Sequence, residues 1–396
     1  RNLESNGVIV HWAKDAQEFN EIAYSILAEH NVKKLVKSKS MLTEECEMNK
    51  YLIAKGIDVV ETDLGERILQ LMNLKPAHIV VPAAHITRDE VGELFEKDGI
   101  SKDIGNHDPT YLTQCARYSL RQEFIEADAG MTGCNFGVAS TGDCVVCTNE
   151  GNADMSTSIP KLHIVSMGID KVIPNYDALA VFQRLLARSA TGQPSVSFTS
   201  QFRKARPGAE MHVILVDNGR SNIIADQLHW RTAKCIRCGA CMNTCPVYRR
   251  SMGYSYNYFI PGPIGINLGM VHNPKKHSGN VSACSLCLSC DLVCPVKVAP
   301  GSQIYYWRQA LEGFGTDNKE KKYMSVAMTE LYEHPAIYSV ATKYAHFANI
   351  IPQKMMDVKP NTWSVGHDMP HFPKKTFHTL YKQMMEEEKE KEKGIK

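Results

Sequence analysis

The chain lacks a long apolar segment. None of its hydrophobic runs approaches the roughly 18 residues that suggest a membrane-spanning helix. No charged and then apolar leader opens the chain either. These two absences predict a cytoplasmic protein without a transmembrane segment. The first residue is Arg1 rather than methionine, so we expect the chain to be a fragment or a processed form.

The chain also lacks an excess of charge of either sign. Its 45 basic and 43 acidic residues are mixed along the sequence and give a formal net charge of +2. No basic patch is present that would attract nucleic acid or an anionic membrane. The sequence therefore predicts a protein that binds no nucleic acid.

Two common nucleotide-binding motifs are missing as well. Residues 151–158 ("GNADMSTS") fail the G-x-G-x-x-G pattern, and no P-loop is present. No histidine is paired by motif with a base that could take a hydroxyl proton. The sequence thus offers no recognisable hydride acceptor, and its catalytic residues stay unknown.

Cysteine, by contrast, is abundant. Eight of the 13 cysteines lie in two runs with the same C-x-x-C-x-x-C-x-x-x-C-P spacing, at residues 235–246 and 284–295. In a long chain without a leader, cysteines indicate metal or redox chemistry rather than disulfides. Structural zinc usually uses two C-x-x-C pairs separated by a loop. The third cysteine, the fourth cysteine and the proline favour iron-sulfur chemistry, with zinc as the alternative that soft thiolates also allow.

Two matched runs predict two [4Fe-4S] clusters. In two-cluster ferredoxins the fourth cysteine of each run binds the cluster of the other run. We therefore expect the first cluster to be held by Cys235, Cys238, Cys241 and Cys294, and the second by Cys284, Cys287, Cys290 and Cys245.

The other five cysteines are expected to be structural. Cys144 and Cys147 form a C-x-x-C pair, but in an extended strand they face opposite sides and cannot bind one ion. Cys46, Cys115 and Cys134 are scattered, which is typical of small buried hydrophobic residues.

The order of helical and strand patterns predicts an α/β fold followed by a helical region. Short β-rich runs, among them residues 7–13, 78–84 and 211–219, alternate with helical stretches and predict a mainly parallel sheet covered on both faces. The turn-forming residues 254–265 are expected to interrupt the helices beside the clusters and to offer a contact for a partner. The expected domains are an α/β domain at 1–220, a two-cluster ferredoxin-type domain at 221–315, and a helical extension with a charged tail at 316–396.

The chain resembles the lactate utilization iron-sulfur protein B family, in which a lactate-utilization (LUD) domain precedes a two-cluster ferredoxin domain. The resemblance extends over nearly the whole chain. It rests on residues 36–45 ("VKSKSMLTEE"), 59–66 ("VVETDLGE"), 132–152 ("TGCNFGVASTGDCVVCTNEGN"), 185–193 ("LLARSATGQ"), 216–221 ("VDNGRS"), 235–250 ("CIRCGACMNTCPVYRR") and 261–265 ("PGPIG").

The resemblance implies a function and an ancestry. It implies that the chain is an oxidoreductase subunit of a cytoplasmic complex with two partner proteins, A and C. This complex oxidises L-lactate to pyruvate, and the chain carries the electrons through its clusters. The natural electron acceptor stays unknown. The resemblance also implies that the α/β domain is similar to the CoA-transferase and sugar-phosphate-isomerase superfamily.

Two other functions stay open. The chain could serve only assembly and electron relay, with catalysis wholly on a partner. Alternatively, its α/β domain could bind or transfer an acyl-CoA, with Glu150 as a carboxylate nucleophile, although "TNEGN" at 148–152 also fits a simple turn. A small anionic ligand is expected near the turns of residues 141–152, with Asn152 and Arg188 as candidate contacts.

Overall fold

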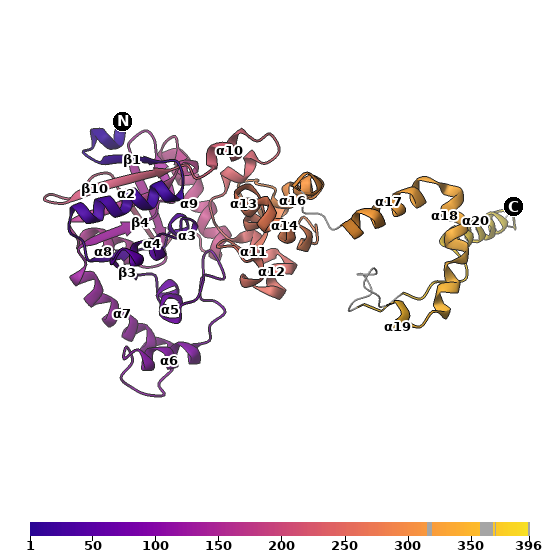
Figure 1. Cartoon of the computed structure of the whole chain (residues 1–396), viewed down its shortest axis with the longest axis horizontal. Helices are drawn as coiled ribbons and strands as arrows, with labels where there is room; N and C mark the ends of the chain where they lie inside the picture. The colour runs from indigo at the N-terminus through magenta and orange to yellow at the C-terminus, as the bar shows by residue number, and fades with distance from the viewer. Residues whose placement is uncertain (315–318, 357–366, 369, 395–396) are drawn as a thin grey trace. The chain divides into compact units, whose positions relative to one another are not determined.

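The computed structural model of the chain describes residues 1–314, 319–356, 367–368 and 370–394. These residues form two compact units, Arg1–Leu311 and Glu312–Lys396 (Figure 1). The expected division at residue 220 falls within the first unit, and the expected domain boundaries stay predictions.

A six-stranded sheet lies at the centre of the first unit (Figure 1). All of its neighbouring strands pair in parallel, in the order β1-β10-β7-β4-β2-β3. The strands are β1 (Ile9–Ala13), β2 (Lys34–Lys37), β3 (Asp58–Glu61), β4 (Ala129–Thr132), β7 (Leu162–Gly168) and β10 (Glu210–Val216). The prediction of an α/β fold with a parallel sheet is confirmed.

Helices cover both faces of this sheet. Successive side chains of a strand point to opposite faces. Leu35 in β2 accordingly packs in one core with Phe19 of α2 (Ala16–Glu29) and Met48 of α4 (Met48–Ala54). Its neighbour Val36 packs in another core with Leu120 of α7 (Pro109–Glu126). The other helices of this part are α1 (Asn2–Ser5), α3 (Met41–Glu45), α5 (Leu64–Met72), α6 (Arg88–Lys97), α8 (Asn152–Ser158), η1 (Ile169–Lys171) and α9 (Tyr176–Thr191).

A smaller sheet has the order β8-β5-β6-β9. Its strands are β5 (Phe136–Val138), β6 (Asp143–Thr148), β8 (Val172–Ile173) and β9 (Phe198–Phe202). Cys144 and Cys147 lie on β6 and pack into two different hydrophobic cores. The prediction that they face opposite sides of a strand is confirmed.

The strand expected at residues 78–84 was wrong, because this segment forms a loop. The ring of His78 accepts the amide protons of Val80 and Val81 at 3.1 and 3.2 Å, which bends the backbone. On its other side the ring contacts Asn243, with 3.0 Å between His78 Nε2 and Asn243 Oδ1. Ile79 and Val80 of this loop thus lie against the first cysteine loop instead of joining the sheet.

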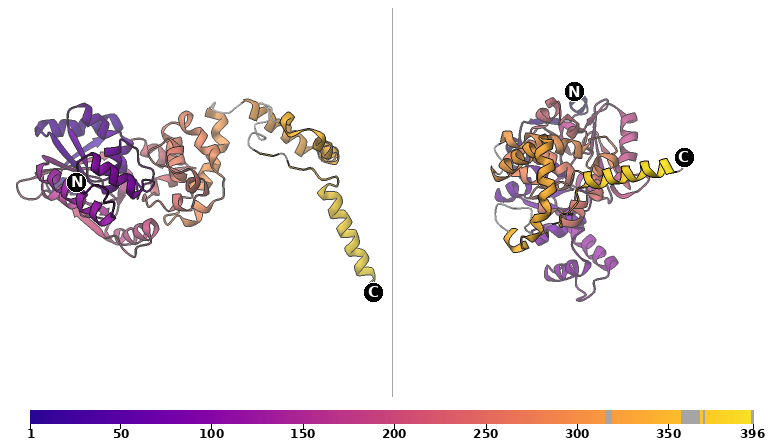
Figure 2. Two further views of the ribbon diagram at one scale, coloured as in Figure 1. Left: turned by 90° about the horizontal axis from the view of Figure 1, so that it is seen from below. Right: turned by 90° about the vertical axis from the view of Figure 1, so that its right-hand side faces the viewer.

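The cysteine-bearing part of the first unit is helical and packs beside the sheet (Figures 1 and 2). The prediction of a helical region after the α/β fold is confirmed. Its helices are α10 (Arg220–Ala225), η2 (Trp230–Lys234), α11 (Ala240–Thr244), α12 (Pro246–Ser251), η3 (Tyr254–Tyr256), α13 (Gly262–His272), α14 (Pro274–Ala283), α15 (Ser289–Val293) and α16 (Pro300–Ala310). The short helix η4 (Leu311–Phe314) begins at the last residue of this unit.

The turn-forming stretch 254–265 behaves only partly as expected. Its prolines begin the helix α13 rather than interrupt one, since a proline in the first turn needs no amide proton. A Cβ at Gly265 would lie 1.7 Å from the carbonyl oxygen of Ile260, so this turn requires a glycine. Residues 260–265 are buried, and only Tyr254, Ser255 and Asn257 of the stretch are exposed. Most of the segment is therefore core and offers little surface to a partner.

The second unit consists of helices in the residues that are described. They are α17 (Lys319–Glu333), α18 (Pro335–Tyr344), η5 (Ala345–Ile350), α19 (Gln353–Met356) and α20 (Phe377–Gly394). The helix expected in the charged tail is present as α20, and the last two residues of that tail lie outside the described residues. Within the described ranges of the chain, no helix has the length and apolarity needed to cross a membrane.

Candidate iron-sulfur centre and adjoining cavity

The two cysteine loops have the same backbone conformation. Two residues after Cys235 and after Cys284, the backbone is left-handed, with φ of 62° and 53°. It is left-handed again two residues later, at Gly239 and at Leu288, with φ of 78° and 59°. Such angles are uncommon outside glycine. Their repetition in register indicates that both loops wrap their sulfurs around the same kind of object.

Backbone amides point at the sulfurs. The sulfurs of Cys235 and Cys284 each accept a hydrogen bond from the amide two residues later, at 3.4 Å. The sulfur of Cys245 accepts from the amide three residues later at 3.5 Å, and that of Cys294 from the amide four residues later at 3.2 Å. Hydrogen bonds to ligand sulfurs stabilise negative charge there and tune the potential of an iron-sulfur cluster.

The fourth cysteine of the second run lies with the first run. A small cavity is lined by the sulfur-bearing residues Cys235, Cys238, Cys241 and Cys294 together with apolar side chains. Conversely, Cys245 is close enough to Cys284 to raise the pKa of that thiol, after the larger effect of burial. The small cavity therefore groups Cys294 with the first triplet, and Cys245 lies near Cys284 of the second.

The donor set fits an iron-sulfur cluster. Burial raises the pKa of Cys238 to about 11 and that of Cys290 to about 12, so thiolates at these positions need a positively charged partner. Among the described residues, no three of the eight loop sulfurs lie within 4.8 Å of one another. Four sulfurs on a tetrahedral zinc ion would lie about 3.8 Å apart. The loops are therefore more open than a tetrahedral zinc site.

Buried charges surround the first loop. Lys171 donates from Nζ to the carbonyl of Cys235 at 3.0 Å and lies 3.2 Å from Asp170. Arg220 pairs with Asp170 at 2.7 Å and with Glu45 at 2.8 Å. Burial opposes the ionised form of Asp170, but its cationic neighbours outweigh burial and lower its pKa. The buried charged residues here are Glu45, Asp170, Lys171, Arg220 and Arg237. Three cations against two carboxylates leave a positive surplus, which suits the negative charge of a thiolate-bound cluster.

Arg308 of α16 fixes the start of the second loop. Its guanidinium donates to the carbonyl oxygens of Val281 and Ser282, each at 3.2 Å, and to that of Cys284. A guanidinium that holds three carbonyls leaves little freedom to the loop. The second triplet is thus tied to the helix that follows it.

A larger cavity of about 180 Å³ adjoins the first loop on the side of the sheet. Its floor comes from residues at or just after the carboxyl ends of β2, β4 and β7, among them Ser40, Gly133 and Gly168. From β2 the chain continues to β3 at one edge of the sheet, and from β4 it continues to β7 and β10 in the other direction. The gap between β2 and β4 is therefore a topological switch point, where α/β sheets bind ligands. Ile79, Ile236 and Arg237 line both this cavity and the small one between the sulfurs.

The residues expected near an anion site are only partly brought together. Asn152 lines the larger cavity, whereas Arg188 is exposed and lies outside its lining. Glu150 also lies outside the lining, and its Oε1 accepts the amide of Leu64 at 3.2 Å. Burial and then the charge of Asp63 raise the pKa of Glu150 to about 7.

Sequence reasoning missed several residues that line this cavity. Lys39 and Ser40 lie inside the quoted stretch 36–45, and Arg237 lies inside the first cysteine run, so these three had a signal in the sequence. Lys171 had no such signal, because it ends the short 3-10 helix η1 after β7 and belongs to no motif. Only the fold shows that these four side chains share one cavity.

A buried lysine occupies the carboxyl end of β2 and faces three carboxyl groups. Lys37 is 0% exposed, and its Nζ lies 2.7 Å from Glu61 and 3.3 Å from Glu44. Burial alone lowers the pKa of Lys37, but the neighbouring carboxyl groups outweigh burial and raise that pKa. Burial, followed by the charge of Glu61, raises the pKa of Glu66 well above its usual value. This group orders the ends of β2 and β3, and its three glutamates line a separate cavity.

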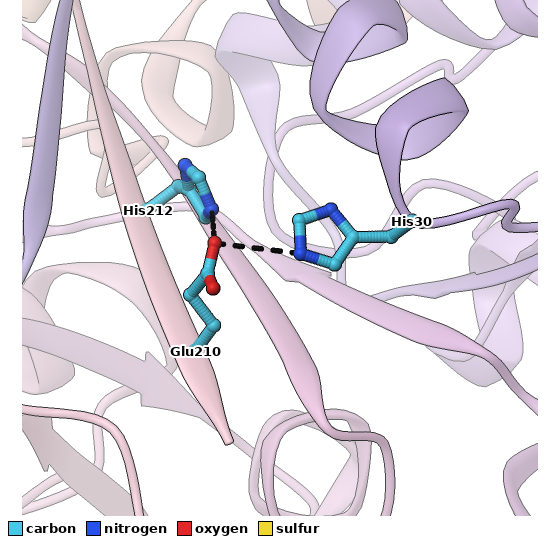
Figure 3. Close-up of side chains that lie close together, drawn as sticks. All are labelled: His30, Glu210 and His212. Carbon is cyan, nitrogen blue, oxygen red and sulfur yellow. Dashed lines mark hydrogen bonds and ion pairs between the residues drawn. The ribbon is translucent and has the colours of Figure 1, made fainter. Parts of the chain in front are cut away.

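Another group of potential metal ligands lies at the opposite ends of the strands. Figure 3 shows Glu210, which begins β10, between the rings of His30 and His212. Its Oε1 lies 2.5 Å from His212 Nε2 and 3.4 Å from His30 Nε2. This ion-paired group joins the end of α2 to β10 and takes no part in the cavity.

The chain matches two protein families. Residues 1–217 match the LUD domain, and residues 231–298 match the 4Fe-4S dicluster domain. The second match contains all eight cysteines of the two loops. An iron-sulfur cofactor in this part of the chain is therefore supported by family as well as by geometry.

Three curated proteins are similar over most of the chain. Lactate utilization protein B of Oceanobacillus iheyensis is 39% identical over 355 residues, which are 87% of this chain and 73% of that protein. Lactate utilization protein B of Bacillus pumilus is 37% identical over an alignment of 407 positions, which covers 98% of this chain and 84% of that protein. "Uncharacterized electron transport protein YkgF" of Escherichia coli is 36% identical over an alignment of 402 positions, which covers 98% of this chain and 83% of that protein. These likenesses span both the sheet and the cysteine-bearing helices.

Proposed function

The chain belongs to the lactate utilization protein B family, and from this premise we propose that it is the iron-sulfur electron-transfer subunit of a cytoplasmic complex that oxidises L-lactate to pyruvate. Its presumed partners are two further lactate utilization proteins, A and C. The family and the dicluster domain support the electron-transfer role, and the complex and the direction of the reaction are our proposal.

The observation that carries the proposal is the pair of matched loops, with Cys294 lining the small cavity of the first triplet. In this proposal Cys235, Cys238, Cys241 and Cys294 hold the first [4Fe-4S] cluster, and Cys284, Cys287, Cys290 and Cys245 hold the second. When bound, two clusters supply two one-electron carriers, which suits the two electrons released by a hydroxy acid. The crossing joins the loops into one rigid element and so fixes the spacing of the two carriers.

The surroundings of the loops favour a direction for the electrons. The first loop adjoins the large cavity at the strand ends. The second loop faces outward: Cys287 is exposed, and Leu292 in α15 is 81% exposed. Leu288 and Val293 extend this apolar surface, and exposed apolar patches of this kind mark contacts with other proteins. We therefore place the entry of electrons at the cavity and their exit, toward the acceptor, at α15.

Two alternatives remain. In one, the chain serves only assembly and relay, and catalysis lies wholly on a partner. In the other, the α/β domain is like that of CoA-transferases and binds an acyl-CoA. The raised pKa of Glu150, about 7, favours the second alternative, since a buried carboxyl group can act as a nucleophile or base. Its place outside the cavity lining weighs against that role.

Mixing the purified proteins tests the proposal. We expect L-lactate to leave the visible absorbance of the isolated, cluster-loaded chain unchanged, because no hydride-acceptor motif is present. After proteins A and C are added, L-lactate should bleach that absorbance. Dithionite serves as the control that shows the clusters to be reducible. Bleaching of the isolated chain would move catalysis onto this protein, and no bleaching in the complete mixture would refute the proposed role.

A further inference from the structure

Two imidazoles and a carboxylate converge at the amino end of β10. His30 follows α2, and Glu210 and His212 both lie on β10 (Figure 3). One ligand atom from each of the three side chains lies within 4.8 Å of the other two. The side chains of His30 and Glu210 are 31% and 44% exposed, while that of His212 is buried. The group is thus open to solvent on one side, where an ion can reach it.

The ring of His30 presents a lone pair to this group. Its Nδ1 lies 2.9 Å from the carbonyl oxygen of Ile26 in the last turn of α2. Because a carbonyl oxygen only accepts, Nδ1 carries the proton and donates it. In the neutral ring Nε2 is then an acceptor, and it lies 3.4 Å from Oε1 of Glu210. Two acceptors face each other here, so a positive charge between them, on a metal ion or a proton, removes the conflict.

The ring of His212 is oriented by a third histidine. Its Nδ1 lies 2.9 Å from Nε2 of His11, which comes from the neighbouring strand β1. Histidines that bind metals almost always use their other ring nitrogen in a hydrogen bond of this kind. When Nε2 of His212 binds a metal ion, the proton of the neutral ring lies on Nδ1 and is donated to His11. Both imidazoles are therefore held in place by partners outside the group.

The distances are close to those of a metal site. Nitrogen and oxygen ligands lie about 2.0–2.2 Å from zinc, so that two of them on a tetrahedral ion are about 3.4 Å apart. The atoms His30 Nε2 and Glu210 Oε1, at 3.4 Å, already have this separation. The hydrogen-bonded atoms His212 Nε2 and Glu210 Oε1, at 2.5 Å, must separate by about 0.9 Å. The side chain of Glu210 can make this movement because it faces solvent on one side.

We propose that His30, Glu210 and His212 bind a divalent transition-metal ion of the zinc class, with water completing its coordination. Two imidazoles and one carboxylate suit zinc, whereas magnesium and calcium take oxygen ligands. The ion joins the end of α2 to β10 and, through His11, to β1 at the edge of the sheet. Its role is structural, since it lies at the opposite ends of the strands from the large cavity. The inference is independent of the proposed function and leaves the loop cysteines to iron.

Equilibrium dialysis of the cluster-loaded full chain against Zn²⁺, under anaerobic conditions, tests the inference. We expect about one zinc ion per chain in addition to the iron, and no displacement of that zinc by excess Mg²⁺. His30→Gln and Glu210→Gln each remove one ligand and should weaken zinc binding by at least about tenfold. Both variants should keep the iron content of the wild type, which shows that a loss of zinc is not a loss of folding.

His334→Gln is the matched control. His334 is an exposed histidine whose Nε2 lies 3.7 Å from Glu330, but this pair has no second imidazole in the group. The control variant should bind zinc as tightly as the wild type does. A loss of zinc in His334→Gln that equals the loss in His30→Gln would contradict the proposed ligand set.

X-ray absorption at the zinc edge identifies the ligands without interference from the iron. We expect only nitrogen and oxygen neighbours, at about 2.0–2.2 Å from the zinc. Sulfur neighbours at about 2.3 Å would place the zinc in the cysteine loops and overturn the inference. So would zinc binding that is unchanged in both His30→Gln and Glu210→Gln. If the wild type binds no zinc, a proton rather than a metal joins His30 to Glu210, and the inference is wrong.

Discussion

Replacing Cys294 by serine will remove the cluster held by Cys235, Cys238 and Cys241, and will leave the other cluster in place. The reason is the small cavity that these four cysteines line together, although Cys294 follows the second triplet in the chain. A serine oxygen is a harder ligand than a thiolate and holds iron-sulfur clusters poorly. Electron paramagnetic resonance of the reduced variant should show one cluster signal instead of two interacting ones.

The matched variant is Cys290→Ser. Cys290 is buried like Cys294 and lies only four residues before it, but it belongs to the second triplet. This variant should lose the second cluster and keep the first. If both variants lose the same cluster, the fourth ligands are not crossed and the proposed ligand sets are wrong.

Replacing Lys37 by methionine should lower the free energy of unfolding by about 3–5 kcal/mol. Lys37 is fully buried and supplies the counter-charge for Glu61 at 2.7 Å, and removing one partner of a buried ion pair leaves an uncompensated charge. A loss of this size corresponds to a fall in Tm of roughly 10 °C for a unit of this size. Circular dichroism of the cluster-loaded protein, heated under anaerobic conditions, would measure it.

The control and the rescue follow from the same electrostatics. Lys50→Met removes an exposed lysine that lies 3.8 Å from Glu47, and exposed ion pairs of this kind contribute little, so Tm should hardly change. The double variant Lys37→Met with Glu61→Leu removes both charges and should recover most of the lost stability. If Lys37→Met alone melts like the wild type, the buried lysine does not order the ends of β2 and β3.

The sequence predicts the features that follow from local pattern. The cysteine spacing identifies the loops because three thiolates of one run must wrap around one cluster. The left-handed backbone at Arg237 and Leu286 lets each loop make this turn. The alternation of apolar strands with amphipathic helices also predicts the parallel sheet, because it too is a pattern of neighbouring residues.

Features that depend on contacts between distant segments escape this kind of reasoning. Residues 78–84 are apolar enough for a strand, but His78 bonds to the amides of its own loop and to Asn243, so tertiary contacts override the local pattern. The cavity is built in the same way, since Lys39, Asn152 and Arg237 come from separate parts of the chain. The turns at 141–152 predict a nearby anionic ligand, but only the fold identifies the hydrogen-bond partner of Asn152.

The central claim is that eight cysteines hold two [4Fe-4S] clusters. Iron and acid-labile sulfide analysis of protein purified anaerobically tests it most directly. Each of the eight iron atoms of the two clusters has one cysteine ligand in the matched runs, so we predict about eight iron atoms and about eight sulfides per chain. Stoichiometric zinc without sulfide would contradict the claim.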